Sequence, residues 1–236
     1  MKLLEFDTLG STNTYLKEHY EELDSLTLVS AKTQLKGRGR KERVWESERG
    51  NLYCSLLIKD PFFYTHFEEI SVVAAYTVLK VLEKHGIPNL SVKWPNDVYV
   101  EDRKICGILL EGVYQERMEC LIVGIGVNLN QQRFPRFFQN RPTSYCLEKG
   151  EFTDVNEFRD ELYEALCAHL ADMKEGHSFY HDILPYDYLA GKDVYANIEN
   201  RKVLVKVHGI QENYTLKAEY NGRDYFLRSG EISFHL

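Results

Sequence analysis

The chain has 236 residues, of which 44% are hydrophobic and 13% aromatic, with a formal net charge of −7, so it can bury a core and is not intrinsically disordered. The acidic balance argues against non-specific nucleic-acid binding, because a DNA-binding surface has to neutralise phosphates. No apolar run reaches membrane-spanning length and acidic residues interrupt the N-terminus, so we expect a soluble, cytoplasmic protein of one or two domains that does not bind membranes.

Helical and strand patterns alternate through the first three quarters of the chain. Ser11 or Thr12 is placed to cap the first helix, and Thr153 or Asp154 to cap the last. In chain order we expect a helix over residues 12–23, strands over 26–30 and 52–58, a helix over 72–82, strands over 92–94, 98–100, 105–114 and 120–129, and a helix over 158–173. The five cysteines are widely spaced in apolar surroundings, which favours buried small side chains over metal ligands.

The last quarter of the chain shows only short alternating strands, which we expect at residues 193–198, 202–208, 214–220 and 225–227. Asn221-Gly222, between the last two, predicts a two-residue hairpin turn that needs positive φ at both positions. The pattern therefore indicates a small β-barrel domain.

The segment from Gln34 to Trp45 gathers cations inside an acidic protein. Arginines and lysines crowd this loop, opposed by Glu42 alone, while Gly37 and Gly39 allow the backbone to approach a ligand closely. Such a run is typical either of an anion-binding loop or of a solvated basic loop. The cations of the loop are Lys36, Arg38, Arg40, Lys41 and Arg43.

Four other short motifs accompany the arginine loop in a fixed order. They are Ser11-Thr12-Asn13 before the loop and, after it, Lys93-Trp94-Pro95-Asn96-Asp97, then Lys104 with Gly107-Ile108-Leu109-Leu110-Glu111, and Ile122-Val123-Gly124-Ile125-Gly126-Val127-Asn128. With these motifs the chain resembles the biotin protein ligases, and Gly230 to Ser233 resembles the closing strand of their final domain. The resemblance implies an α+β fold similar to the class II aminoacyl-tRNA synthetases, with a mixed sheet flanked by helices over residues 1–187 and an SH3-like β-barrel over 188–236.

The resemblance also implies an activity. The enzyme would activate biotin with ATP to biotinoyl-5′-AMP, using Mg²⁺, and transfer biotin to a lysine of the biotin carboxyl carrier protein of a carboxylase such as acetyl-CoA carboxylase. A lipoate or octanoate ligase or transferase on a related fold is the alternative, and a non-enzymatic biotin sensor is a third reading. Because the first motif begins at residue 11, we expect the short, ligase-only form of the family, without an N-terminal DNA-binding domain and without a DNA partner. A homodimer is possible.

Site residues follow from the resemblance by position. The catalytic residues would be Lys104, Arg38, Arg40 and Asp97. Biotin would meet Ser11, Thr12, Asn13, Gln34, Gly37, Arg38, Gly39, Arg40, Lys104 and Gly107, and ATP would meet Arg38, Arg43, Trp45, Lys104 and Asn128. Asp97 would serve either the acceptor lysine or Mg²⁺, the metal ligands being otherwise unknown.

Several of these positions also have purely structural readings. Ser11 and Thr12 would serve as helix caps, Gly107 would form a β-bulge, and Lys93 and Trp94 would be structural. The glycines at 124 and 126 read as close packing rather than a dinucleotide fingerprint.

Overall fold

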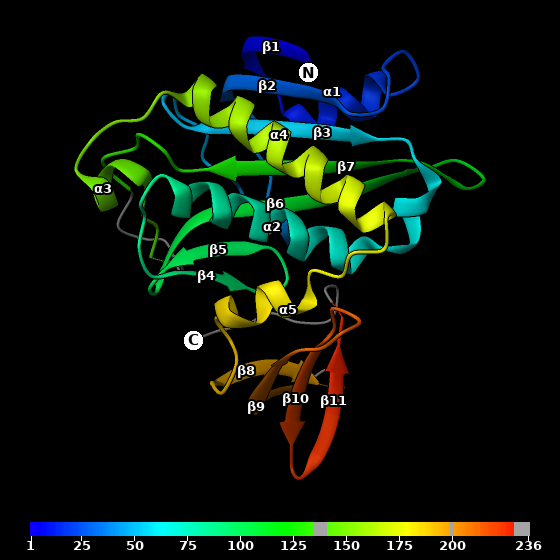
Figure 1. The fold of residues 1–236 in the computed structure, drawn as a ribbon, viewed down its shortest axis with the longest axis vertical. Coiled ribbons are helices and arrows are strands. Elements are labelled where there is room, and N and C mark those ends of the chain that lie inside the picture. The colour runs from blue at the N-terminus through cyan, green and yellow to red at the C-terminus, as the bar shows by residue number, and fades with distance from the viewer. Residues whose placement is uncertain (135–140, 199–200, 229–236) are drawn as a thin grey trace.

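A computed structural model describes residues 1–134, 141–198 and 201–228 (Figure 1). The closing strand expected at 230–233 lies outside these residues. The helices are α1 (Thr12–His19), η1 (Arg40–Glu42), η2 (Pro61–Thr65), α2 (Phe67–Lys84), α3 (Tyr145–Lys149), α4 (Val155–Lys174), α5 (Tyr180–Ile183) and η3 (Leu184–Tyr186). The strands are β1 (Lys2–Leu9), β2 (Thr27–Gln34), β3 (Leu52–Ile58), β4 (Leu90–Lys93), β5 (Asp97–Val100), β6 (Arg103–Tyr114), β7 (Met118–Val127), β8 (Asp193–Ile198), β9 (Arg201–Ile210), β10 (Leu216–Tyr220) and β11 (Arg223–Leu227).

Seven strands form the main sheet in the order β1-β2-β3-β7-β6-β5-β4. The pair β1–β2 is parallel and all other neighbours in this sheet are antiparallel, so the sheet is mixed. Helices α2 and α4 lie across one face of it (Figure 1). The expected α+β class with a mixed sheet flanked by helices is confirmed.

The two faces of the sheet carry different cores because strand side chains alternate in direction. Leu56 of β3 joins the large cluster beneath α2 and α4, whereas its neighbour Leu57 joins a smaller cluster with Leu16 of α1. Helix α1 covers only part of this second face, packing against β2, β3 and β7. The rest of that face is free to carry a ligand site.

The C-terminal strands form a second sheet in the order β11-β10-β9-β8. Asn221 and Gly222 have φ of 52° and 72°, as the expected hairpin turn requires. This sheet is attached to the edge of the main one, where the Trp94 indole N–H donates to the Tyr214 carbonyl at 2.8 Å and Val92 pairs with Asp187. The small β domain therefore meets the main sheet beside the motif that runs from Lys93 to Asp97.

Some local expectations were wrong. Helix α1 ends at His19, not near Leu23, and neither Ser11 nor Thr12 caps it, because the Ser11 side chain makes no capping hydrogen bond and the Thr12 hydroxyl is engaged elsewhere. Asp154, by contrast, does cap α4, accepting from two backbone N–H groups. Strand β1 and helices α3 and α5 were not expected.

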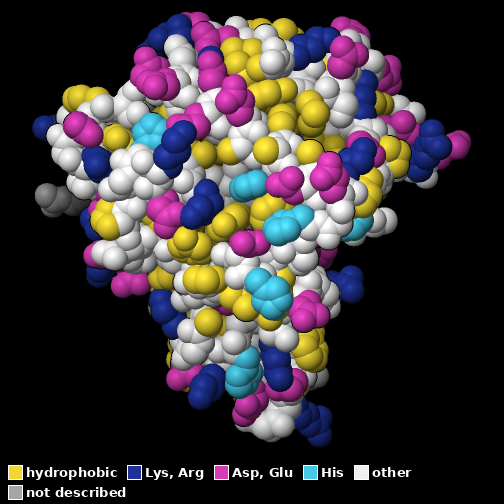
Figure 2. Space-filling model, viewed as in Figure 1, with side chains coloured by type: hydrophobic (Ala, Val, Ile, Leu, Met, Phe, Trp, Pro, Cys, Tyr) yellow, Lys and Arg dark blue, Asp and Glu magenta, His cyan; other side chains and the backbone are white. Residues whose placement is uncertain are grey.

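The cysteines, the helix lengths and the surface charge of the described residues are typical of a globular protein. Four cysteines are buried and Cys167 is partly buried, all as free thiols, as expected. None of the described helices is long and apolar enough to cross a membrane. Basic and acidic side chains are interspersed on the face shown in Figure 2, where no large region of one charge stands out. The concentrated positive charge lies instead in the pocket described next.

Candidate active site

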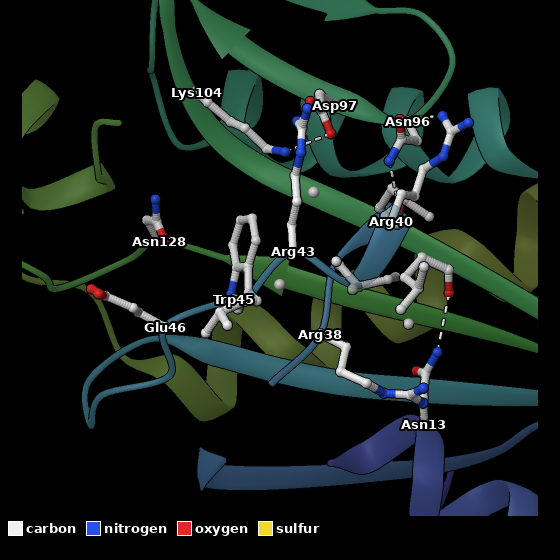
Figure 3. Close-up of a pocket in the computed structure, with 18 of the residues that line it drawn as sticks. Asn13, Arg38, Arg40, Arg43, Trp45, Glu46, Asn96, Asp97, Lys104 and Asn128 are labelled. Atoms are coloured by element: carbon white, nitrogen blue, oxygen red, sulfur yellow. Dashed lines mark hydrogen bonds and ion pairs between the residues drawn. The ribbon is translucent and has the colours of Figure 1, made fainter. Parts of the chain in front are cut away.

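A pocket of about 520 Å³ opens on the sheet face opposite α2 and α4. Its walls come from the start of α1, the arginine loop, the turn at residues 94–97, and strands β6 and β7 (Figure 3). Segments far apart in the chain thus converge on one concave surface. The volume suits a ligand of small-molecule or nucleotide size.

Glycines make the floor of this pocket flat enough for side chains to lie on it. A Cβ on Gly126 would stand 2.7 Å from the Trp45 indole, and one on Gly107 would stand 2.9 Å from the same ring. A Cβ on Gly124 would overlap the Asn13 amide. The close-packing interpretation of the two glycines in β7 is therefore supported, and Gly107 also gives room to Trp45.

One end of the pocket is neutral and polar. The Ser55 hydroxyl on β3 lies 2.5 Å from Asn13 Oδ1 and 2.7 Å from Thr12 Oγ1, and the Gln34 amide oxygen accepts from the Thr12 N–H at 2.9 Å. These groups are buried or nearly so and fix one another's orientation. Such an end suits a ligand with neutral donors and acceptors.

Glu111 organises the rim of this neutral end. Its carboxylate, with a side chain 17% exposed, accepts from Asn13 at 2.8 Å, Lys17 at 2.6 Å and Arg38 at 3.1 Å. Burial by itself would raise the pKa of Glu111, but the hydrogen bonds from Lys17 and Asn13 outweigh it and leave the pKa lowered. Glu111 therefore stays ionised and holds both Asn13 and Arg38 in place.

The other end of the pocket is cationic. Lys104 Nζ pairs with Asp97 at 2.7 Å and lies 5.2 Å from the Trp45 ring centroid. Arg40 donates to the Asn96 amide oxygen at 3.2 Å, and the Arg43 side chain extends toward the Lys104–Asp97 pair (Figure 3). The cations surround one space with a single carboxylate among them, a setting that attracts an anion.

The structure brings together nearly all the residues predicted for the site. Asn128, expected at the nucleotide, is buried and donates its amide to the Thr143 carbonyl. Gly37, within the arginine loop, is not among the residues that line the pocket, and a Cβ there would overlap the Trp45 carbonyl. The predicted residues that do line it are Ser11, Thr12, Asn13, Gln34, Arg38, Gly39, Arg40, Arg43, Trp45, Asp97, Lys104, Gly107 and Asn128.

The polar residues that belong to the site but were not predicted for it include Ser55, Glu111, Asn96 and Lys93. Three of them stand inside recognised motifs, so motif membership was the available signal. Ser55 had none, since a serine in an apolar strand is unremarkable until the fold sets it beside Asn13.

Fold and pocket together define an α+β ligand-binding protein with a site for a small anionic molecule on the open face of a mixed sheet. Residues 5–128 match the Biotin/lipoate A/B protein ligase family, and the chain belongs to this family. The Escherichia coli bifunctional ligase/repressor BirA is 30% identical over 235 residues, covering 95% of this chain and 71% of that protein. A Paracoccus denitrificans biotin–[acetyl-CoA-carboxylase] ligase is 32% identical over 163 residues, with 66% and 68% covered.

Among solved structures, the biotin protein ligase of Aquifex aeolicus in complex with biotin and ATP superimposes with a TM-score of 0.88 at 29% identity, covering 99% of this chain and 98% of that one. Other relatives are matched only in part. The segment shared with BirA of Bacillus subtilis, 36% identical over 132 residues, spans 41% of that protein.

Proposed function

We propose that this protein is a biotin protein ligase, which makes biotinoyl-5′-AMP from biotin and ATP and transfers biotin to a lysine of a biotin carboxyl carrier protein. The observation that carries the proposal is the two-ended pocket, with a neutral hydrogen-bonding end beside a cationic end. Biotin has the matching form, a neutral ureido ring joined by an apolar tail to a carboxylate. Family membership and the fold shared with the Aquifex ligase support the same conclusion.

In the first step, two anions have to meet. Arg38, Arg40 and Lys104 reduce the repulsion between the biotin carboxylate and the ATP phosphates, and they stabilise the charge that develops around the α-phosphate. Guanidinium groups offer a planar fork to phosphate or carboxylate oxygens, whereas the lysine is a compact point charge. A carboxylate oxygen of biotin attacks the α-phosphorus of ATP, the bond from that phosphorus to the bridging oxygen breaks, and pyrophosphate leaves with the electron pair, which yields the mixed anhydride.

The nucleotide would lie over the glycine floor. Trp45, flat against Gly126 and Gly107, and Asn128 at the edge of the pocket are the residues we assign to it. The carboxylates among the described lining residues are Asp97 and Glu46, oxygen donors of the kind that Mg²⁺ takes. These two carboxylates would hold a Mg²⁺ ion that arrives with ATP, and the ion would supply charge neutralisation of the phosphates.

Lipoate and octanoate ligation is the competing function. Both alternative substrates carry a carboxylate on an aliphatic chain but lack a ureido ring, so they offer no hydrogen bonds to the polar end of the pocket formed by Thr12, Asn13 and Gln34. An apolar ligand group that covers polar side chains without bonding to them loses affinity. The neutral end of the pocket therefore favours biotin.

Further properties belong to the proposal. We assign residues 1–187 to a catalytic domain and 188–236 to an SH3-like domain, with a cytoplasmic location and no DNA partner. The interface between the two parts beside Asp97 supports a role of the second in transfer.

The test is pyrophosphate release by the purified protein with Mg·ATP and biotin, lipoate or neither. We expect release that depends on biotin and leaves a tightly held adenylate. Release that is equal with lipoate, or independent of either acid, would contradict the proposal.

A further inference from the structure

Ser55 is a buried serine next to the neutral end of the pocket. It is 0% exposed, belongs to strand β3, and is not among the described residues that line the pocket. Its hydroxyl contacts two residues that do line it, Asn13 at 2.5 Å and Thr12 at 2.7 Å. Any effect of Ser55 on a ligand therefore has to pass through these two side chains.

The orientation of the Asn13 amide is fixed by two acceptors. Its NH2 group faces the Glu111 carboxylate at 2.8 Å and the Leu109 carbonyl at 3.3 Å. Neither of these donates, since burial alone would raise the pKa of Glu111 but the hydrogen bonds from Lys17 and Asn13 leave it lowered, so that the carboxyl is ionised. The Asn13 amide oxygen is therefore the atom that faces Ser55, and it can only accept.

A hydroxyl has one proton, so the contacts of Ser55 take a definite direction. Ser55 donates to Asn13 Oδ1, because that oxygen has no proton to give. The contact between Ser55 and Thr12 then uses the Thr12 proton, with Ser55 Oγ as the acceptor. The donors thus run one way, from Thr12 through Ser55 and Asn13 to Glu111.

The Thr12 hydroxyl is thereby left as an acceptor toward the pocket. Turning its proton toward a ligand would leave the two hydroxyl oxygens of Thr12 and Ser55 2.7 Å apart with no proton between them, which is repulsive. Gln34 imposes no such constraint: its amide oxygen lies 3.2 Å from Thr12 Oγ1 but keeps the Thr12 N–H as a partner at 2.9 Å. A ligand group beside the Thr12 hydroxyl has therefore to be a donor, such as the N–H of a cyclic urea.

We propose that Ser55 is a positioning residue that sets substrate specificity, because it holds the Thr12 hydroxyl as a hydrogen-bond acceptor and so selects a ring N–H over a ring oxygen. Glu111 supplies the fixed end of this chain of donors through Asn13. The inference rests on the proposed biotin ligase function. The competing explanation is that Ser55 only fills space within strand β3.

Two cyclic carbamate analogues of biotin probe this polarity, each with one ring N–H replaced by oxygen. The ring keeps nearly the same shape, but a donor becomes an acceptor. Dissociation constants of biotin and of both analogues are measured by calorimetry for the wild type, Ser55→Ala and Ser30→Ala. Ser30→Ala is the matched control, because Ser30 is also buried, belongs to the neighbouring strand β2, and donates to the Tyr53 carbonyl at 3.3 Å rather than to Thr12 or Asn13.

We expect the wild type to bind at least one analogue about 10- to 100-fold more weakly than biotin. In Ser55→Ala the Thr12 hydroxyl is free to turn and donate to the ring oxygen, so this ratio should fall to about threefold or less. Ser30→Ala should keep the wild-type ratio. A residue that only fills space would instead change the affinities for biotin and for the analogues by the same factor, which leaves the ratio unchanged.

Several results would overturn this role. They are a wild-type ratio in Ser55→Ala, an equal fall of the ratio in Ser30→Ala, and equal binding of all three ligands by the wild type. If Ser55→Ala does not fold, Thr12→Val decides alone, since it removes the acceptor and keeps the shape of the side chain: its ratio should also fall, and an unchanged ratio would remove both Thr12 and Ser55 from this selection. Absence of biotin binding to the wild type would instead contradict the proposed function itself.

Discussion

Replacing Trp94 by phenylalanine tests how the C-terminal sheet supports the active site. The indole is 1% exposed, and its N–H donates to the Tyr214 carbonyl at 2.8 Å across the interface between the two sheets. Phenylalanine keeps an aromatic ring but has no donor. The Tyr214 carbonyl would lose this partner in a buried place, next to the turn that presents Asn96 and Asp97 to the pocket.

A buried acceptor that loses its donor costs about 1–3 kcal/mol. For a chain of this size each kcal/mol lowers Tm by about 2–4 °C, so we expect Tm to fall by about 2–12 °C in differential scanning calorimetry. The rate of biotin transfer to the carrier protein should also fall, because the turn that carries Asp97 is held less firmly.

Trp45→Phe is the matched control. Its indole nitrogen is buried without a hydrogen-bond partner among the described residues, so the same substitution removes no hydrogen bond. Its Tm should stay close to that of the wild type, while nucleotide binding suffers. A Trp94→Phe protein as stable as the wild type, or a Trp45→Phe protein that loses as much as Trp94→Phe, would refute the reasoning.

Three other changes should have separable effects. Lys104→Ala should slow biotin-dependent pyrophosphate release by about 10² while biotin binding in calorimetry persists; normal release would remove Lys104 from its role. The folded-state pKa of Glu111 is lowered, so its carboxylate contributes stability that is present above the ordinary value of 4.5 and is lost as the pH falls through the lowered pKa. Glu111→Gln should therefore flatten the fall in stability with acid below pH 4.5, and an unchanged profile would contradict the network. Gly126→Ala should displace the Trp45 indole and raise KM for ATP about tenfold, whereas Gly39→Ala, whose Cβ would meet nothing closer than 3.6 Å, should not; equal effects of the two would show that floor shape is unimportant.

Local rules predicted the elements whose stability is local. Strand β3 has the bounds expected from its apolar run, and the Asn221-Gly222 turn follows from the positive φ that few residues tolerate. Strand β1 escaped prediction because it is largely exposed and is formed by parallel pairing with β2, a partner that its own sequence does not reveal.

The site residues also divide into those that local motifs predict and those that depend on contacts between distant segments. Lys104 and Asp97 stand in recognisable motifs, so their positions were predictable even though their 2.7 Å contact was not. The burial of Lys93 depends on Tyr188, nearly a hundred positions away along the chain, and no local pattern carries that information. Contacts between distant segments are what the sequence alone does not specify.

Mass spectrometry of a biotin carboxyl carrier protein incubated with this protein, Mg·ATP and biotin tests the central claim most directly. The account predicts that one biotinyl group is added to the acceptor lysine, and that a carrier with arginine at that position stays unmodified. A carrier left unmodified by the native enzyme, or one modified with lipoate but not with biotin, would contradict it.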